Sequence, residues 1–239
     1  MRGGFQRQPR GATNPYMQPV ASIVKLGGGS SQALTQLDAT ALACDMLSYG
    51  DDLFRRLKRA EAGSLLILLA ENGHEPALAA AVKAASILRR RGGGEAAVVL
   101  PSIPALPGPR ARHRLERAAQ QIGGCLMQPV GAASWTDAVR CIVEPLAVFG
   151  LIGVDPREIH GLLRTRLALL HLWDDASLDS SLQDARDVLV SCRLRPSATL
   201  REVDAAATRV RTATAARLVL AGPEVPRDEG PDAIAAVFL

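Results

Sequence analysis

Short apolar segments that alternate with helical patterns place the strongest constraint on the fold of this chain. The first, Leu65–Leu69, is apolar at every position and comes shortly after a glycine, which is typical of a strand buried on both faces of a parallel sheet. Similar segments follow at 96–100 and 125–127, and helical patterns at 76–91 and 110–121 separate the three. This β-α-β-α-β order predicts a doubly wound parallel sheet with right-handed connections.

A buried helix is predicted next, from Trp135 to about Val148. Ser134 can cap it, with Asp137 at the third helical position. Its apolar side chains cover more than one face, which indicates a helix enclosed between layers or domains. Pro145 removes one backbone hydrogen bond and should bend it.

The pattern changes beyond Gly150 and predicts a smaller α/β unit. Its expected elements are a helix at 156–164, a strand at 167–172, a helix at about 178–192, a helix that a Thr199–Glu202 capping box opens and that runs to about 212, and strands at 217–221 and 233–238. Before the first clear strand, residues 32–59 favour a helical segment. Residues 1–20, rich in Gly, Pro, Gln and Arg, are typical of a disordered tail.

Composition allows a folded core and weakens a nucleic-acid function. Hydrophobic residues make up 48% of the 239, which excludes disorder over most of the chain. The net charge is +4, but residues 1–20 hold three arginines and no acid, so the rest of the chain is nearly neutral. A surface for binding polyanions is therefore not required.

The remaining patterns exclude several kinds of site. The four cysteines lie far apart, which fits a reduced, cytoplasmic chain, and no apolar run is long enough to span a membrane. No spacing of the four histidines predicts a metal site, and no phosphate-loop motif occurs. The triplet Gly27, Gly28 and Gly29 is a weak candidate for binding an anion through backbone N–H groups, against the alternative of a plain turn.

The segment FGLIGVDPRE at 149–158, directly after the buried helix, resembles the FtsZ/tubulin superfamily. There the central helix ends in P-G-L-I-N-x-D-x-x-D, a loop that reaches into the GTP site of the neighbouring subunit. Asp155 and Glu158 fall on the two acids, and Gly153 replaces the asparagine.

Further segments resemble the family in the same order. They are the strand at 65–69 with its loop and the helix at 76–91, the helix at 112–121 with the strand at 125–129, the helix that begins LREVDAA at 200–206, and the last two strands. The resemblance covers roughly residues 60–239. It implies an α/β fold with a reduced Rossmann-like (tubulin/FtsZ-type) parallel sheet, a long central helix and a smaller, mixed-sheet second domain. The implied parts are a disordered tail (1–20), a reduced nucleotide-type domain (21–133), a central linking helix (134–150) and a C-terminal domain (151–239).

The chain departs from the family where GTP would bind. FtsZ binds the phosphates on G-G-G-T-G-T-G, whereas this chain has Glu71-Asn72-Gly73-His74-Glu75 at that place. A carboxylate facing a triphosphate repels it, and a single glycine gives few N–H groups room to approach. The resemblance therefore implies a degenerate pseudo-GTPase without a cofactor.

The function we expect is that of a non-enzymatic, cytoskeletal or cell-division-associated protein. It would bind FtsZ-like subunits, or itself, through an end-to-end interface formed by Gly153, Asp155 and Glu158. In the family both acids act on water at the partner's terminal phosphate; here they are expected to be relics, and the alternative for Glu158 is a simple helix-start acid. Two other readings stay open: a GTPase that binds GTP through rearranged loops, and an unrelated doubly wound binding or scaffold protein.

Overall fold

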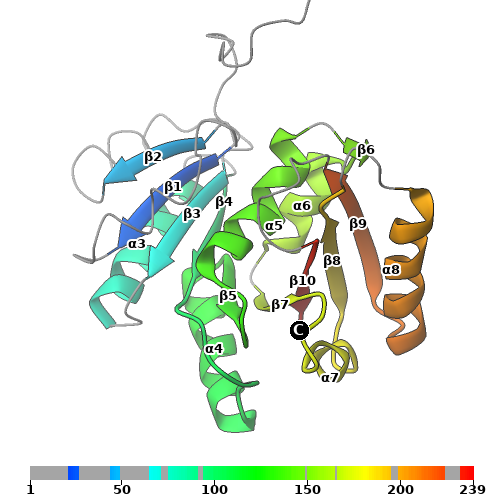
Figure 1. Cartoon of the computed structure of the whole chain (residues 1–239). Coiled ribbons are helices and arrows are strands. Elements are labelled where there is room, and N and C mark those ends of the chain that lie inside the picture. Colours follow the sequence, from blue (N-terminus) through cyan, green and yellow to red (C-terminus); the bar gives the residue numbers. More distant parts are fainter. Residues whose placement is uncertain are drawn as a thin grey trace, which may run out of the picture.

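In the computed structural model (Figure 1), ten strands form one sheet in the order β2-β1-β3-β4-β5-β7-β10-β8-β9-β6. The structure describes residues 21–26, 44–48, 65–70, 75–90, 94–148, 150–164, 166–194, 199–223 and 232–239. In the part of the chain so described, no helix is long and apolar enough to cross a membrane.

The first six strands of this order are parallel to one another. They are β2 (Cys44–Ser48), β1 (Ala21–Leu26), β3 (Leu65–Ala70), β4 (Glu95–Val99), β5 (Cys125–Pro129) and β7 (Leu167–Leu172). The next part is mixed, because β10 (Ala233–Phe238) is antiparallel to both β7 and β8 (Asp187–Cys192). Beyond them, β9 (Arg217–Pro223) is parallel to β8, and β6 (Gly150–Ile152) is antiparallel to β9 at the edge.

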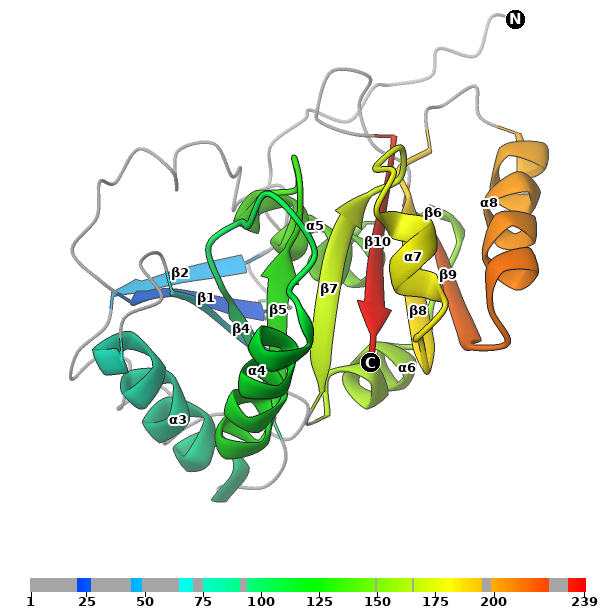
Figure 2. The ribbon, with the colours of Figure 1, turned by 90° about the horizontal axis from the view of Figure 1, so that it is seen from below.

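Helices cover both faces of the sheet (Figure 2). On one face, α3 (Glu75–Arg90) and α4 (Pro109–Ile122) pack on the parallel strands, and α7 (Leu178–Leu182) and α8 (Leu200–Ala213) pack on the mixed strands. The other face carries α5 (Trp135–Ala147) and α6 (Pro156–Leu162).

The hydrophobic core is continuous on one face of the sheet and divided on the other. Under α5 and α6, one cluster extends from Ala21 on β1 to Phe238 on β10. On the opposite face, one cluster lies beneath α3 and α4, and a separate one lies beneath α7 and α8. The line between these two clusters, where α4 and α7 face each other across β7, is called the seam below.

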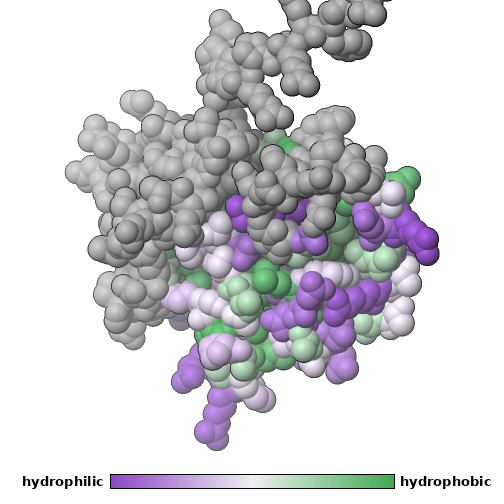
Figure 3. All heavy atoms as spheres, in the orientation of Figure 1, coloured by the Kyte–Doolittle hydropathy of each residue, from purple (hydrophilic) through white to green (hydrophobic). Residues whose placement is uncertain are grey.

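The surface of the described part mixes polar and apolar residues on the face shown in Figure 3. Among the described residues, Leu200 is the one large hydrophobic side chain classed as exposed, at 64%. It stands at the first position of α8, directly after the capping residue Thr199. A single exposed leucine of this kind is ordinary for a folded protein and does not by itself mark an interface.

Most of the predicted elements are confirmed. The strands predicted at 65–69, 96–100, 125–127, 167–172, 217–221 and 233–238 correspond to β3, β4, β5, β7, β9 and β10, and the helices predicted at 76–91, 110–121, 135–148, 156–164 and 199–212 to α3, α4, α5, α6 and α8. The predicted fold class, an α/β protein with a Rossmann-type sheet and a mixed second part, is confirmed as well. The expected disordered tail at 1–20 lies outside the described residues.

Two predicted helices are wrong. The helical segment expected at 32–59 contains strand β2, which pairs in parallel with β1 from Ala21↔Cys44 onward. The helix expected at 178–192 ends at Leu182, and β8 begins at Asp187. The β8 segment is buried at all six positions between β10 and β9, so tertiary pairing overrides the helix-like spacing of its leucines and valines.

The sheet does not stop at the predicted domain boundary. Strands β5 and β7 lie on either side of it in the sequence, and they pair in parallel from Leu126↔Leu167 to Pro129↔Leu170. The two regions therefore share one hydrogen-bonded sheet. Their division into a nucleotide-type domain, a linking helix and a C-terminal domain stays a prediction.

Candidate functional site

The carboxyl ends of the parallel strands form the edge at which sheets of this type bind ligands. The strand order reverses at β1, which has β2 on one side and β3 on the other, and ligands bind outside such a switch point. Leu26 and Ala70 end these strands as register partners. The candidate glycines Gly27, Gly28 and Gly29 and the loop 71–74 follow them in the sequence but lie outside the described residues, so their role stays a prediction.

The described turns after β4, β5 and β7 contain no positive side chain of their own. The turns after β4, β5 and β7 cover residues 100–108, 130–134 and 173–177, and none of them contains lysine or arginine. Their polar groups bond to one another: the Ser102 hydroxyl donates to Gly131 O at 3.2 Å, and the Gln128 amide donates to Pro101 O at 2.5 Å. The turn after β7 adds the carboxylates of Asp174 and Asp175. A triphosphate would meet repulsion at this part of the edge.

Helix α5 starts at the same edge and runs beneath the sheet. Its capping box is complete, because the Ser134 hydroxyl accepts from Asp137 N at 3.2 Å and Ser134 N donates to the Asp137 carboxylate at 2.9 Å. Of the eight residues from Ala138 to Pro145, six are buried. The helix contacts β5 in the parallel part of the sheet and β8, β9 and β10 in the mixed part. The helix therefore underlies both the parallel and the mixed part of the sheet.

A buried ion pair fixes α5 against the mixed strands. Arg193, directly after β8, donates through Nε to the Glu144 carboxylate at 2.8 Å, and the two side chains are only 2% and 4% exposed. The Arg140 guanidinium lies 3.9 Å from the other oxygen of the same carboxylate. Two arginines therefore neutralise the one buried acid of the helix's last turn.

The predicted interface loop is exposed. Gly153, Asp155 and Glu158 all lie on the surface, between β6 and the first turn of α6. A side chain at Gly153 would meet open space, so packing does not require a glycine there. The Asp155 carboxylate accepts from Arg157 N at 2.8 Å and caps α6, while Glu158 stands in the first turn.

This loop connects the carboxyl end of β9, where β6 pairs with Gly222 and Pro223, to helix α6. Helix α6 leads into the amino end of β7, and Arg164, just after the helix, donates to Glu95 at the start of β4 at 3.0 Å. Figure 2 likewise places α6 where β7 begins and β10 ends. Asp155 and Glu158 therefore follow β6, which forms the edge of the sheet on the side away from β1 and β3.

Comparison with known proteins supports a fold. No family model matches the chain, and no curated protein matches it. Among the solved structures, a single-substitution mutant of FtsZ from M. jannaschii superposes with a TM-score of 0.56 at 13% sequence identity, over 91% of this chain and 90% of that one. The chain has an FtsZ-like fold.

The FtsZ-like fold covers 91% of this chain, more than the stretch from about residue 60 that carries the sequence resemblance. At this level of identity the likeness concerns the fold, and the roles of Gly153, Asp155 and Glu158 stay predictions.

One polar cluster was missed by the sequence reasoning. His171 is fully buried on β7 and contacts two serines: Ser177, directly before α7, and Ser181, within α7. The spacing of the four histidines to one another, which predicts no metal site, does not reveal this cluster. The signal that could have revealed the cluster is the run of serines six and ten residues after a histidine in a predicted strand.

Proposed function

We propose that this chain is an FtsZ/tubulin-like protein without GTPase activity of its own, which associates end to end with FtsZ-like subunits or with itself. The supporting observation is the exposed acidic loop with Asp155 and Glu158, which follows the edge strand β6 on the side of the sheet away from β1 and β3. The sequence resemblance places this loop against the next subunit, and the FtsZ-like fold is consistent with that arrangement.

The proposed lack of GTPase activity rests on the loops at the carboxyl ends of the parallel strands. The loop at 71–75 has one glycine and two acids, and the described turns after β4 and β5 contain no lysine or arginine. A subunit of this kind would join a stack through its acidic loop alone. It would act as a cap or regulator of assembly in a cytoplasmic, cytoskeletal or cell-division role.

The proposal is tested with charge-removing variants that preserve the helix cap. Asparagine caps a helix about as well as aspartate, so Asp155→Asn with Glu158→Gln should change stability by less than about 1 kcal/mol. We expect this double variant to sediment less with FtsZ polymers than the unchanged protein, and to lose its effect on FtsZ GTP turnover. Analytical ultracentrifugation of the chain alone tests self-association.

A matched control removes two exposed carboxylates elsewhere. Asp174→Asn with Asp204→Asn changes the charge equally, at the carboxyl-end turn after β7 and on α8. If this control weakens co-sedimentation as much as the loop variant, the effect is one of overall charge and the interface is wrong. Tight binding of GTP by calorimetry, with turnover in the absence of a partner, would instead support the GTPase alternative.

A further inference from the structure

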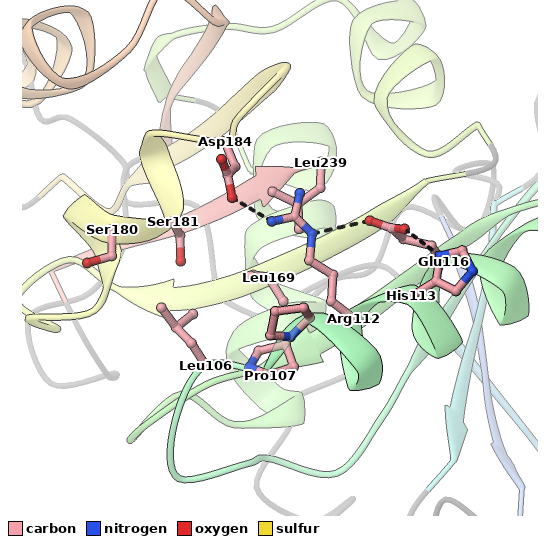
Figure 4. Close-up of a pocket in the computed structure, with 11 residues that line it drawn as sticks. Leu106, Pro107, Arg112, His113, Glu116, Leu169, Ser180, Ser181, Asp184 and Leu239 are labelled. Carbon is pink, nitrogen blue, oxygen red and sulfur yellow. Dashed lines mark hydrogen bonds and ion pairs between the residues drawn. The ribbon is translucent and has the colours of Figure 1, made fainter.

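A cavity opens at the seam between α4 and α7, on the face of the sheet opposite α5 (Figure 4). Its volume is about 480 Å³. Its apolar wall comes from Leu106, Pro107, Leu169 and Leu239, and its polar wall from α4 and α7. This site is distinct from the acidic loop and from the nucleotide edge.

Charge along the polar wall is paired. Arg112 donates through Nη1 to Asp184 at 2.5 Å and through Nε to Glu116 at 3.2 Å. The outer nitrogen of this guanidinium is left to donate to a ligand oxygen. Since two carboxylates flank one guanidinium, an anionic ligand is disfavoured and a neutral molecule with an apolar body fits best.

Ser181 stands at this cavity with its hydroxyl on a histidine. Its Oγ is 2.9 Å from His171 Nε2, within the range for a nucleophile and its base. In Figure 4 the Ser181 side chain extends from α7 toward the strand that carries Leu169, whereas its neighbour Ser180 points away. An alternative acceptor for the same hydroxyl, Ser177 O, is farther away at 3.3 Å.

The groups behind His171 set its tautomer. Ser177 gives its one hydroxyl proton to Asp175 at 2.7 Å, so its oxygen can only accept from His171 Nδ1, which lies 3.2 Å away. The proton on Nδ1 leaves Nε2 free to accept from Ser181. The chain Asp175–Ser177–His171–Ser181 thus has a nucleophile, a base and positioning residues for the base.

The protonation states agree with this geometry. Burial lowers the pKa of His171 below its usual 6.5, so the ring is neutral at pH 7 and can take a proton. Hydrogen bonds from the Ser177 hydroxyl and backbone N–H lower the pKa of Asp175, which is therefore ionised. Gly131 lets this carboxylate lie close, because a Cβ at that position would overlap it.

We propose that Ser181 is a nucleophilic serine, with His171 as its general base, that takes the acyl group of a small, neutral carboxylic ester bound in the seam cavity. Ser181 Oγ attacks the carbonyl carbon while its proton passes to His171 Nε2. The carbonyl oxygen faces the Arg112 side of the cavity. When the ester C–O bond breaks, the alkoxide takes the proton from His171 and leaves as an alcohol.

Water completes the reaction. It gives a proton to His171 Nε2 and attacks the acyl carbon, which releases the carboxylic acid and returns the proton to Ser181. The sum is ester plus water to acid plus alcohol, and no further reactant is needed. The proposal is independent of the end-to-end interface and of nucleotide turnover.

The test is covalent labelling of the full chain with a fluorophosphonate probe, read by intact mass and peptide mapping. We expect one adduct, on Ser181. Ser180→Ala is the matched control and should label as the unchanged protein does, whereas Ser181→Ala should not label. His171→Gln should slow labelling about 10²- to 10⁴-fold, the usual contribution of a general base. Hydrolysis of p-nitrophenyl butyrate should fall in Ser181→Ala and His171→Gln and stay unchanged in Ser180→Ala.

A second variant covers the case in which Ser181→Ala unfolds. Ser181→Cys keeps a small side chain whose S–H can donate to His171. Iodoacetamide should alkylate this cysteine faster than that of Ser180→Cys. Cys44 is present in both cysteine variants, so its alkylation cancels in the comparison. Background from Cys125, Cys141 and Cys192 is expected to be low, because burial raises the pKa of all three thiols, that of Cys192 to about 11. Absence of a Ser181 adduct in the folded protein, or equal alkylation of the two cysteine variants, overturns the proposal.

Discussion

The two ends of the sheet handle charge differently. At the amino end, Asp187 of β8 binds Arg166 before β7 and Arg217 of β9, and both arginines keep contact with water. On the carboxyl side, Arg193 after β8 and Glu144 of α5 form a pair from which water is almost absent. Ion pairs of similar chemistry therefore stabilise weakly at one end and make the protein sensitive to the loss of a partner at the other.

The largest effect should come from the buried pair. Glu144→Ala removes one partner of the buried Arg193–Glu144 pair. Removing one partner of a buried pair costs about 3–5 kcal/mol in cases of this kind. Urea unfolding followed by circular dichroism measures the free energy of unfolding. Because water is excluded there, the loss should change little between low salt and about 1 M salt. A loss below 1 kcal/mol would mean that α5 is held by apolar packing alone.

Asp187→Ala should have a smaller effect at the amino end. Its carboxylate is 9% exposed, but the Arg166 and Arg217 side chains are 32% and 54% exposed and regain water when it is removed. We expect a loss of roughly 1–2 kcal/mol, between that of a surface and a buried pair. High salt should reduce the difference in the free energy of unfolding between the variant and the unchanged protein. A salt-independent loss as large as that of Glu144→Ala would erase the contrast between the two ends.

The smallest effect is a dependence of stability on pH from two histidines, one at each end. Burial lowers the pKa of His171, which also faces Asp175, and that of His160, which lies near Glu95 and Arg164. The unfolded chain therefore binds these protons more readily than the folded one. Stability is complete above the usual value near 6.5 and falls as pH drops toward the lowered pKa values.

Because His171 is fully buried and His160 only partly, His171→Gln should flatten the pH profile more than His160→Gln. Thermal unfolding of both variants between about pH 5 and pH 8 shows this, since the window spans the usual histidine pKa. Equal flattening by the two variants would mean that the rings feel similar environments.

Local signals were enough to predict α5, α8 and β7. Ser134 and Thr199 each begin a capping box, and the capping contacts form within a few residues of the chain. Strands β2 and β8 depend on partners that are distant in sequence, β1 for one and β9 and β10 for the other. Helical spacing within each segment therefore misled the prediction.

The candidate sites likewise differ in how much of them the local sequence predicts. The loop before Pro156 is a local signal, because Pro156 favours the first turn of a new helix and Asp155 before it serves as the cap. The contact of Ser181 with His171 requires α7 to fold back on β7, and the seam cavity requires α4 to lie beside α7. The residue spacing within a single segment predicts neither contact, because each joins segments that are separate in sequence. The cluster and the cavity can therefore be found only in the three-dimensional structure.

The joining of β5 to β7 has a mechanical consequence. A load applied at the acidic loop passes through α6 into β7, and from there through the backbone ladder into β5 and β4. Parallel strands pulled along their length resist as a group, because several hydrogen bonds must break together. The molecule should therefore transmit tension from one end to the other as a stiff plate rather than bend between two halves.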